Sequence, residues 1–420
     1  MLEVANLATE INKQLPGEMV EFMRLSGEMA QRRGQKLYLV GGVVRDLLLG
    51  RGNFDLDLVV EGDAIALARE LAEAKNCRLT THQRFGTAKL RWNGWSADIA
   101  TARSETYTKA CALPTVNPST IRDDLFRRDF TINAIAVELT PGSYGHLLDL
   151  YGGLADLEKK LIKVLHDESF VDDATRIWRA VRYEQRLDFQ LEPKTLEMVK
   201  RDVDYLKKVS GDRLRHELEL FFKEAYPEKA LRRASELSVL GKLHSKLKAD
   251  SWLSAKYEQA RRRSSPDIPS FGLYLALLVY RMGSSDVEGL VSCLKLRKST
   301  TVTLCDTIDL KANLGHLADP QITPAQVYKW LVGYAAEAVV ANVIAAEVPE
   351  AVRCLTEFIK KWRYIKPALN GEDLKRLGVA QGPELKDMLK RLLEARLEGE
   401  AVTKRDEEAL VRNWLAGKNR

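Results

Sequence analysis

Two acidic residues in the segment FDLDLVV are the first candidates for chemistry in this sequence. Asp55 and Asp57 flank Leu56 in a segment that alternates polar and apolar residues. Because side chains of a strand alternate between its two faces, both carboxylates are predicted to project from one face, while Leu56 and Leu58 point into the core. Carboxylate oxygens can share Mg²⁺, and two such ions would activate a hydroxyl nucleophile and stabilise a leaving pyrophosphate. Taken alone, so short a pattern is more often a solvated strand edge or a turn cap.

A third carboxylate is expected from a neighbouring strand, and Asp98 is the best candidate for it. Asp98 stands in SADIATA, an apolar, strand-like segment in which a lone acid would be costly to bury. The alternative is again a solvated residue at a strand edge.

A glycine pair upstream of the acids favours phosphate chemistry. Gly41 and Gly42 follow the apolar segment KLYLV and precede VVRDLLLG, and twelve residues separate Gly42 from Asp55. Glycines between a strand and a helix let backbone N–H groups approach a triphosphate, at the positive end of the helix dipole. Arg45, one turn into that helix, can add a charge-assisted contact.

The elements that must position these residues form a mixed α/β region. The pattern predicts an amphipathic helix over 17–35, strands over 36–42 and 54–60, and further strands in RLTTHQ, TAKLRW and SADIATA. After about residue 149, segments of helical period dominate and strand candidates almost vanish. This division favours a catalytic module of roughly 140 residues followed by a helical arm of roughly 280 residues.

Composition sets outer bounds on the protein. A chain of 420 residues suggests two to four packed units, because single cores stop growing near ~250–300 residues. The formal charge of +6 is a mild bias toward an acidic partner. Five scattered cysteines suggest neither a zinc knuckle nor a disulfide framework, and fit a reducing cytoplasm. Neither a signal peptide nor a membrane span is expected, because no window reaches ~18 uninterrupted apolar residues.

The segment RRDFTINAIA is the first of two arginine-containing candidates. It carries Arg128 and Asp129 directly before an apolar run. A purely structural interpretation is a basic helix start with Asp129 as its N-cap.

The segment DDATRIWRAVR is the second. It places an acid and three arginines at three-residue steps, so that a helix would carry them along one gently drifting face. A solvated helix with internal ion pairs is the structural alternative. The four residues are Asp173, Arg176, Arg179 and Arg182.

LVGGVVRDLLLG followed by FDLDLVV resembles the nucleotidyltransferase signature of the polymerase-beta superfamily. More narrowly, these motifs with RRDFTINAIA and DDATRIWRAVR resemble the bacterial and eukaryotic class of tRNA CCA-adding enzymes and their bacterial poly(A) polymerase relatives. The resemblance implies transfer of C and A from CTP and ATP to the 3′ end of tRNA, with two Mg²⁺ ions expected at Asp55, Asp57 and Asp98. Poly(A) polymerase, CC-adding and A-adding activities stay open, since they can use the same residues.

The resemblance also implies an α+β fold in four parts. They are a small mixed-sheet, polymerase-beta-like head (1–140), a neck with base-recognition helices (141–222), a helical body (223–365) and a helical, tRNA-binding tail (366–420). The oligomeric state is left open by the sequence.

In the family, the segment around Arg128 closes the nucleotide pocket, and the helix that begins near Asp173 acts as a protein template. The base chemistry is consistent with this role: cytosine and adenine each present an exocyclic amine beside a ring-nitrogen acceptor. Asp173 can accept from the amine and Arg176 can donate to the ring nitrogen, which leaves unpaired groups against U or G. Arg179 and Arg182 match positions that help hold the phosphates and sugar.

Three further features complete the sequence interpretation. Asp172 stands where the family usually has glutamate, and the shorter side chain changes the reach of that carboxylate. Residues 102–126 resemble a flexible loop linked to the switch from C to A, although a plain connector fits equally well. Arg213 and Glu217, at i,i+4 spacing in SGDRLRHELELFF, are interpreted as scaffold.

Three competing functions are less favoured. The dipeptide His166-Asp167 suggests a phosphohydrolase of the HD type, but the six histidines do not supply the further ligands. A binding-only protein would be expected to lose one of the acids, and a small-molecule nucleotidyltransferase would lack the base-reading helix and the long basic arm.

Overall fold

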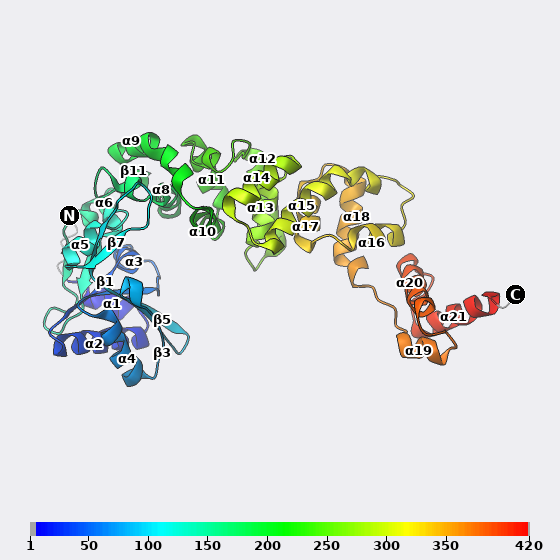
Figure 1. The fold of residues 1–420 in the computed structure, drawn as a ribbon, viewed down its shortest axis with the longest axis horizontal. Coiled ribbons are helices and arrows are strands. Elements are labelled where there is room, and N and C mark those ends of the chain that lie inside the picture. Colours follow the sequence, from blue (N-terminus) through cyan, green and yellow to red (C-terminus); the bar gives the residue numbers. More distant parts are fainter. Residues whose placement is uncertain (1–5, 419–420) are drawn as a thin grey trace. The chain divides into compact units, whose positions relative to one another are not determined.

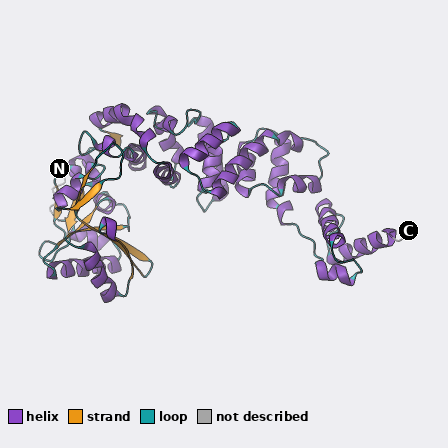
Figure 2. Cartoon of the chain, in the orientation of Figure 1, coloured by secondary structure: helices purple, strands orange, loops and turns teal. Residues whose placement is uncertain are grey.

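A computed structural model describes residues 6–418 of the chain, with side chains up to residue 417. The chain divides into two compact units. The first comprises residues up to Glu217 together with Arg233–Lys242, and the second comprises Leu218–Arg232 and the residues from Leu243 onward. Figure 2 shows that the strands gather in the first unit and that helices make up the second.

The first unit is built on a seven-stranded sheet of order β3-β4-β5-β2-β1-β8-β9. β2 and β5 run parallel, while every other neighbouring pair in this sheet is antiparallel. The mixed sheet predicted from the sequence is therefore confirmed. The strands are β1 (Lys36–Val40), β2 (Leu56–Glu61), β3 (Arg78–His82), β4 (Thr87–Trp92), β5 (Trp95–Thr101), β8 (Ile135–Glu138) and β9 (Leu147–Asp149).

Both faces of the central strands are buried, which explains their nearly continuous apolar sequences. Helices α2 (Gly17–Arg32) and α4 (Ala64–Lys75) contact each other and the strands on one side (Figure 1). On the other side, Tyr38, Val40 and Val59 pack in one cluster with Ile121 and Leu125 of α5 (Ile121–Phe126). The core thus holds the central strands rigidly from both sides.

The acidic strand begins two residues later than its pattern predicts. β2 starts at Leu56, and Asp55 lies just before it because the Asp55 N–H bonds to Oδ1 of Asn53 at 3.0 Å rather than to a neighbouring strand. Asp57 lies within the strand. The two carboxylates therefore come from different backbone environments.

Short helices and small strand pairs surround the main sheet. Two further sheets pair β6 (Arg103–Thr106) with β7 (Thr115–Pro118) and β10 (Leu161–Ile162) with β11 (Gln190–Leu191). The remaining helices of this unit are α1 (Ala8–Gln14), α3 (Gly42–Leu48), α6 (Gly153–Glu158), α7 (Ser169–Asp172), α8 (Thr175–Leu187), α9 (Pro193–Asp202) and most of α10 (Gly211–Phe222).

In the second unit, every described element longer than a turn is an α-helix. Leu310, Val327 and Leu355 belong to one buried apolar cluster, and Leu374, Met388 and Val411 to another. α11 (Pro227–Glu236) has residues in both units. The helices that follow are α12 (Ser251–Ser264), α13 (Phe271–Val279), α14 (Ser284–Leu294), α15 (Lys298–Ala312), α16 (Pro324–Leu331), α17 (Ala336–Ala345), α18 (Pro349–Lys360), α19 (Gly371–Arg376), α20 (Pro383–Glu398) and α21 (Lys404–Lys418).

A helical arm after a mixed-sheet head is thus confirmed. The finer division into neck, body and tail stays a prediction. Over residues 6–418, no single helix has both the length and the apolar composition to cross a membrane, and one bent pair, α16 with α17, meets these criteria only when taken together.

Candidate active site

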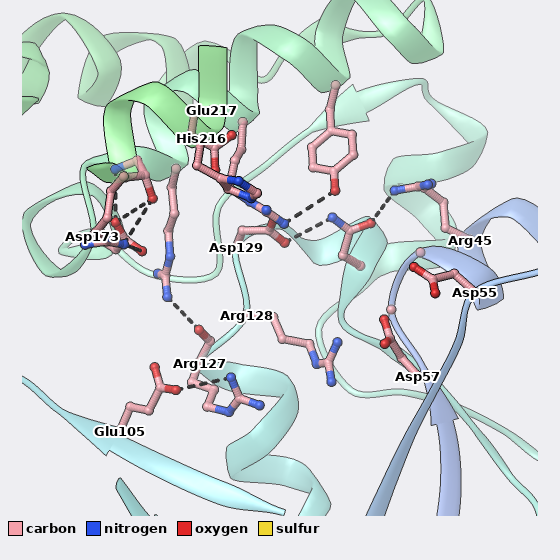
Figure 3. Close-up of a pocket in the computed structure, with 18 of the residues that line it drawn as sticks. Arg45, Asp55, Asp57, Glu105, Arg127, Arg128, Asp129, Asp173, His216 and Glu217 are labelled. Atoms are coloured by element: carbon pink, nitrogen blue, oxygen red, sulfur yellow. Dashed lines mark hydrogen bonds and ion pairs between the residues drawn. The ribbon is translucent and has the colours of Figure 1, made fainter. Parts of the chain in front are cut away.

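A cavity of about 780 Å³ in the first unit collects most of the predicted site residues (Figure 3). Its walls come from the β1–α3 turn, the start of β2, the segment after α5, and helices α8 and α10. All the predicted residues line it except Asp98 and Arg182. Those in the lining are Gly41, Gly42, Arg45, Asp55, Asp57, Arg128, Asp129, Asp173, Arg176 and Arg179.

Gly41 is required by the shape of the turn. Its φ of +77° belongs to the left-handed region, which L side chains rarely adopt. A Cβ at this position would lie 3.0 Å from Nη1 of Arg128 and 3.6 Å from Oδ2 of Asp57. The missing side chain therefore leaves the space into which both charged groups project.

Arg45 lies beneath this turn rather than free in the cavity. It is buried, its Nε and Nη2 donate to the Asp46 carboxylate at 2.9 and 2.8 Å, and its Nη1 donates to Asn133 at 2.7 Å. This guanidinium ties α3 to the segment after α5. Its predicted contact with phosphate stays a prediction.

The third acid lies beside Asp57, on the neighbouring strand. Asp57 and Asp98 are paired in register across the parallel strands β2 and β5. Nζ of Lys89 lies 2.7 Å from Oδ2 of Asp98, which is outside the cavity lining. Within residues 6–418, no group of three or more His, Cys, Asp or Glu side chains is arranged to hold a metal ion.

The electrostatics around Asp57 nevertheless suit a cation. The pKa of Asp57 is raised to about 6, mainly by burial; the charges of Asp55 and Asp98 also raise it, while Arg128 and Lys89 act in the opposite direction. A hard divalent cation would offset this repulsion, and carboxylate oxygens are the ligands it prefers. The donor set therefore fits Mg²⁺ at Asp55 and Asp57.

Arg128 faces the acids across the cavity, as Figure 3 shows. Its Nη2 donates to Oδ2 of Asp124 at 2.9 Å, and Asp124 also accepts from Nη2 of Arg127 at 2.6 Å. Asp124 is fully buried, so it fixes both arginines from below.

Asp129 does not cap a helix, contrary to the structural alternative. Phe130 occupies the N-cap position of the short 3₁₀ turn that follows, and no side-chain hydrogen bond caps it. Instead, Nε and Nη2 of Arg179 donate to Oδ2 of Asp129 at 2.8 and 2.6 Å. Burial opposes ionisation of Asp129, but Arg179 and a bond from Asn133 outweigh it and lower its pKa to about 2. Asp129 thus anchors an arginine of α8.

Asp173 lies just before helix α8 rather than on its face, because its backbone is extended. Its Oδ1 accepts from the backbone N–H and the hydroxyl of Thr175, at 3.0 and 2.7 Å. Its Oδ2 accepts from Nη2 of Arg213, on α10, at 2.6 Å.

Arg176 donates to the hydroxyl of Ser169 at 2.8 Å and to the carbonyl oxygen of Arg127 at 2.6 Å. The pair is held in place by its neighbours.

Arg182 does not reach the cavity, although it continues the three-residue spacing. A three-residue step falls ~60° short of a full helical turn. After two steps from Arg176, Arg182 has therefore rotated away, and it is buried. Tyr183 and Arg186 line the cavity instead, because they lie on the same helical face as Arg179.

Helix α10 supplies site residues that sequence reasoning assigned to scaffold. Arg213, His216 and Glu217 all line the cavity. Glu217 is 6% exposed, its Oε2 has no hydrogen-bond partner, and burial raises its pKa. The i,i+4 spacing of Arg213 and Glu217 was the available signal, since it places both on one helical face.

Together, the fold and the cavity define a nucleotidyl-transfer type of head domain followed by helices. Residues 37–163 match the poly A polymerase head domain, and residues 188–250 match the probable RNA and SrmB-binding site of polymerase A. The A-adding tRNA nucleotidyltransferase of Geobacter sulfurreducens is 34% identical over 94% of this chain and 47% of its own length. Two curated relatives match this chain over most of its length, and the chain spans about half of the length of each of them.

Solved structures match over nearly the whole chain. A CCA-adding enzyme in its apo form II has 31% identity and a TM-score of 0.80, over 98% of this chain and 99% of that one. The Thermotoga maritima CCA-adding enzyme in complex with a tRNA has 30% identity and a TM-score of 0.75, over 98% of both chains. The chain belongs to the family of tRNA nucleotidyltransferases and poly(A) polymerases.

Proposed function

We propose that this protein adds C and A nucleotides to the 3′ end of tRNA without a nucleic-acid template, using CTP and ATP and releasing pyrophosphate. The observation that carries the proposal is one cavity that joins Asp55 and Asp57 to the pair Asp173 and Arg176. The acids serve the transfer and the pair serves the choice of base. A volume of about 780 Å³ is ample for a nucleoside triphosphate.

Asp55, Asp57 and, from the neighbouring strand, Asp98 would hold Mg²⁺. When bound, Mg²⁺ activates the RNA 3′-hydroxyl and stabilises the leaving pyrophosphate. The protein itself contributes positioning. Gly41 keeps the approach to the acids open, and Arg128 offers a fixed positive charge opposite them.

Base selection rests on Asp173 and Arg176. The carboxylate accepts from the exocyclic amine of C or A, and the guanidinium donates to the adjacent ring nitrogen. Asp173 is held by Thr175 and Arg213, so its oxygens are oriented before the nucleotide arrives. A pre-oriented pair rejects U and G because its buried polar groups would stay unpaired against them.

Addition of A alone is the second candidate. It is favoured by the similarity of this chain, over 94% of its length, to the Geobacter protein described as A-adding. Both activities would use the same cavity.

Location and domain roles belong to the same proposal. A cytoplasmic location is supported by the five cysteines, all of which are unpaired. The helices from α19 to α21 are proposed to bind tRNA as a tail.

The test uses the full chain with labelled CTP or ATP and three tRNAs, ending at the discriminator base, at C and at CC. Incorporation of both nucleotides that stops at CCA is expected. Addition of A only to the tRNA ending in CC would select the second candidate, and long A tails would contradict both. Asp55→Ala should abolish transfer while leaving tRNA affinity near the wild-type value.

A further inference from the structure

A second cavity, of about 290 Å³, shares one wall with the 780 Å³ cavity of the candidate active site, which is called the nucleotide cavity below. Glu105, Tyr107, Arg127 and Arg176 line both cavities. The remaining lining comes from Ser104, Asp123, Phe126, His166 and Asp172. None of the residues in this last group was assigned a role in transfer.

An exposed aromatic side chain forms one side of this second cavity. Phe126 is 44% exposed, so part of its ring is open to a ligand. Its ring centroid lies 5.1 Å from that of His166 and 5.7 Å from that of Tyr151. Tyr151 does not line the cavity and supports the Phe126 ring from outside it. The rings therefore form a fixed, partly open surface of the kind on which planar groups stack.

Asp172 provides the free hydrogen-bond acceptor of this cavity. Its carboxylate makes no hydrogen bond to another described residue. Its Oδ2 lies 3.8 Å from Nε2 of His166, a side chain whose pKa burial lowers, and the charge of Arg176 also acts on Asp172. The other acids are occupied. Glu105 accepts from Arg103, Arg127 and Tyr107, and Asp123 accepts from Ser119 and Thr120.

The two cations of the lining are also occupied. Arg127 binds Asp124 and Glu105, and Arg176 binds Ser169 and the carbonyl oxygen of Arg127. A phosphate would therefore meet free carboxylate rather than free positive charge. The ligand that fits is a planar, uncharged group that stacks on a ring and donates a hydrogen bond.

We propose that this cavity receives an amino-bearing nucleobase, C or A, from the single-stranded 3′ end of the RNA substrate. The base stacks on Phe126, and its exocyclic amine donates a hydrogen bond to the Asp172 carboxylate. The proposal rests on RNA being the acceptor, as in the proposed function. A free nucleotide fits less well, because its triphosphate would find no unpaired cation among the lining residues. An RNA strand can leave its phosphates outside while one base enters.

The shared wall gives this subsite a role in the reaction. Arg176, which is proposed to read the incoming base, also lines the second cavity. Asp172 lines the second cavity as well, so the proposed acceptor of the RNA base and the proposed reader of the incoming base share one wall.

The test measures RNA affinity, so it does not depend on which nucleotide is added. A fluorescent acceptor-stem RNA with a single-stranded 3′ end is bound to wild-type protein and to Phe126→Ala, and one tail nucleotide at a time is made abasic. In the wild type, one abasic position should weaken binding roughly 5- to 150-fold, the range of base–aromatic stacking. Phe126→Ala should bind intact RNA less tightly than the wild type does, by a similar factor. The same abasic change should not weaken RNA binding to Phe126→Ala any further.

Two variants separate stacking from general damage. Phe126→Trp keeps a ring and should retain the affinity of the wild type. Asp172→Ala should lose the preference for a base with its amine over the amine-free analogue, 2-pyrimidinone for C or purine for A. Asp167→Ala is the matched acidic control, because Asp167 is 63% exposed, pairs with Lys194 and does not line the cavity.

The loss of RNA affinity caused by an abasic position and the loss caused by Phe126→Ala could instead multiply at every tail position. That result would overturn the subsite, even where CCA addition is found. An increase in the KM for CTP or ATP in Phe126→Ala, with unchanged RNA affinity, would also overturn it. One tail position at which the abasic change weakens binding to the wild type but not to Phe126→Ala supports the subsite, even if the nucleotides added differ from those proposed.

Discussion

Nη2 of Arg213 donates a 2.6 Å hydrogen bond to Oδ2 of Asp173, joining helix α10 to the residue just before helix α8. The other oxygen of Asp173 is held by Thr175. The carboxylate proposed to read the base amine is thus oriented from two sides by residues forty and two positions away in the sequence.

Removing that support should weaken base selection without unfolding the protein. Arg213→Met keeps the length of the side chain but loses the charged donor, so Asp173 gains rotational freedom. We expect the KM for CTP and ATP to rise about tenfold, as for loss of one partly exposed charged hydrogen bond. Steady-state kinetics with each nucleotide, including UTP as a competitor, measures the effect. An unchanged KM would show that Thr175 alone orients Asp173.

The buried pair of Asp129 and Arg179 should contribute stability that depends on pH. The pKa of Asp129 is about 2 in the folded protein against an ordinary 3.8, so ionisation favours the folded state by about 2 kcal/mol at neutral pH. This contribution is complete above the unfolded pKa and is lost as pH falls through the folded pKa. Asp129→Asn should therefore lower the free energy of unfolding by about 2 kcal/mol at pH 7.

Urea unfolding from pH 7 downward checks this. The difference between the wild type and Asp129→Asn should stay constant to about pH 5 and narrow below about pH 4. A difference that persists unchanged into strong acid would assign the loss to packing rather than to charge.

Gly41→Ala should damage the site more than its backbone strain explains. Both Gly41 and Gly50 have positive φ, +77° and +65°, so alanine strains the backbone at either position, and more at Gly41, whose ψ of −140° is nearly restricted to glycine. Only at Gly41 would the methyl group meet charged side chains, whereas at Gly50 nothing lies within 4 Å. We expect a loss of thermal stability in both variants, larger in Gly41→Ala, with a large fall in kcat/KM only in Gly41→Ala. Equal kinetic losses would remove the argument for close approach.

Variants of Asp57 and Asp98 should differ in their response to added magnesium. Asp57 lines the cavity, while Asp98 lies outside its lining, with Lys89 2.7 Å from its carboxylate. Asp57→Asn is expected to reduce transfer at least 10³-fold at any Mg²⁺ concentration, since the loss of a charged metal ligand affects both binding and chemistry. Asp98→Asn should cost less, and added Mg²⁺ should restore part of the activity. Transfer against Mg²⁺ concentration distinguishes the two, and equal, unrescued losses would make Asp98 a full partner.

Local patterns were sufficient for much of the head. A buried strand, a glycine turn and an acidic strand follow from alternation and from the conformational demands of glycine, so β1, Gly41 and β2 could be predicted. Their approach to one another was predictable because strand pairing brings neighbouring segments together. The same reasoning placed Asp98 beside Asp57, a relationship that the register of β2 and β5 confirms.

The tertiary structure decided what depends on packing between distant elements. Asp129 is a partner of Arg179 rather than a cap, and Arg213 belongs to the site rather than to the scaffold. Arg182 turns inward because helical rotation accumulates over each three-residue step. Spacing along the chain determines which residues share a face of one element, while the side chains that meet across a cavity are determined only when those elements pack.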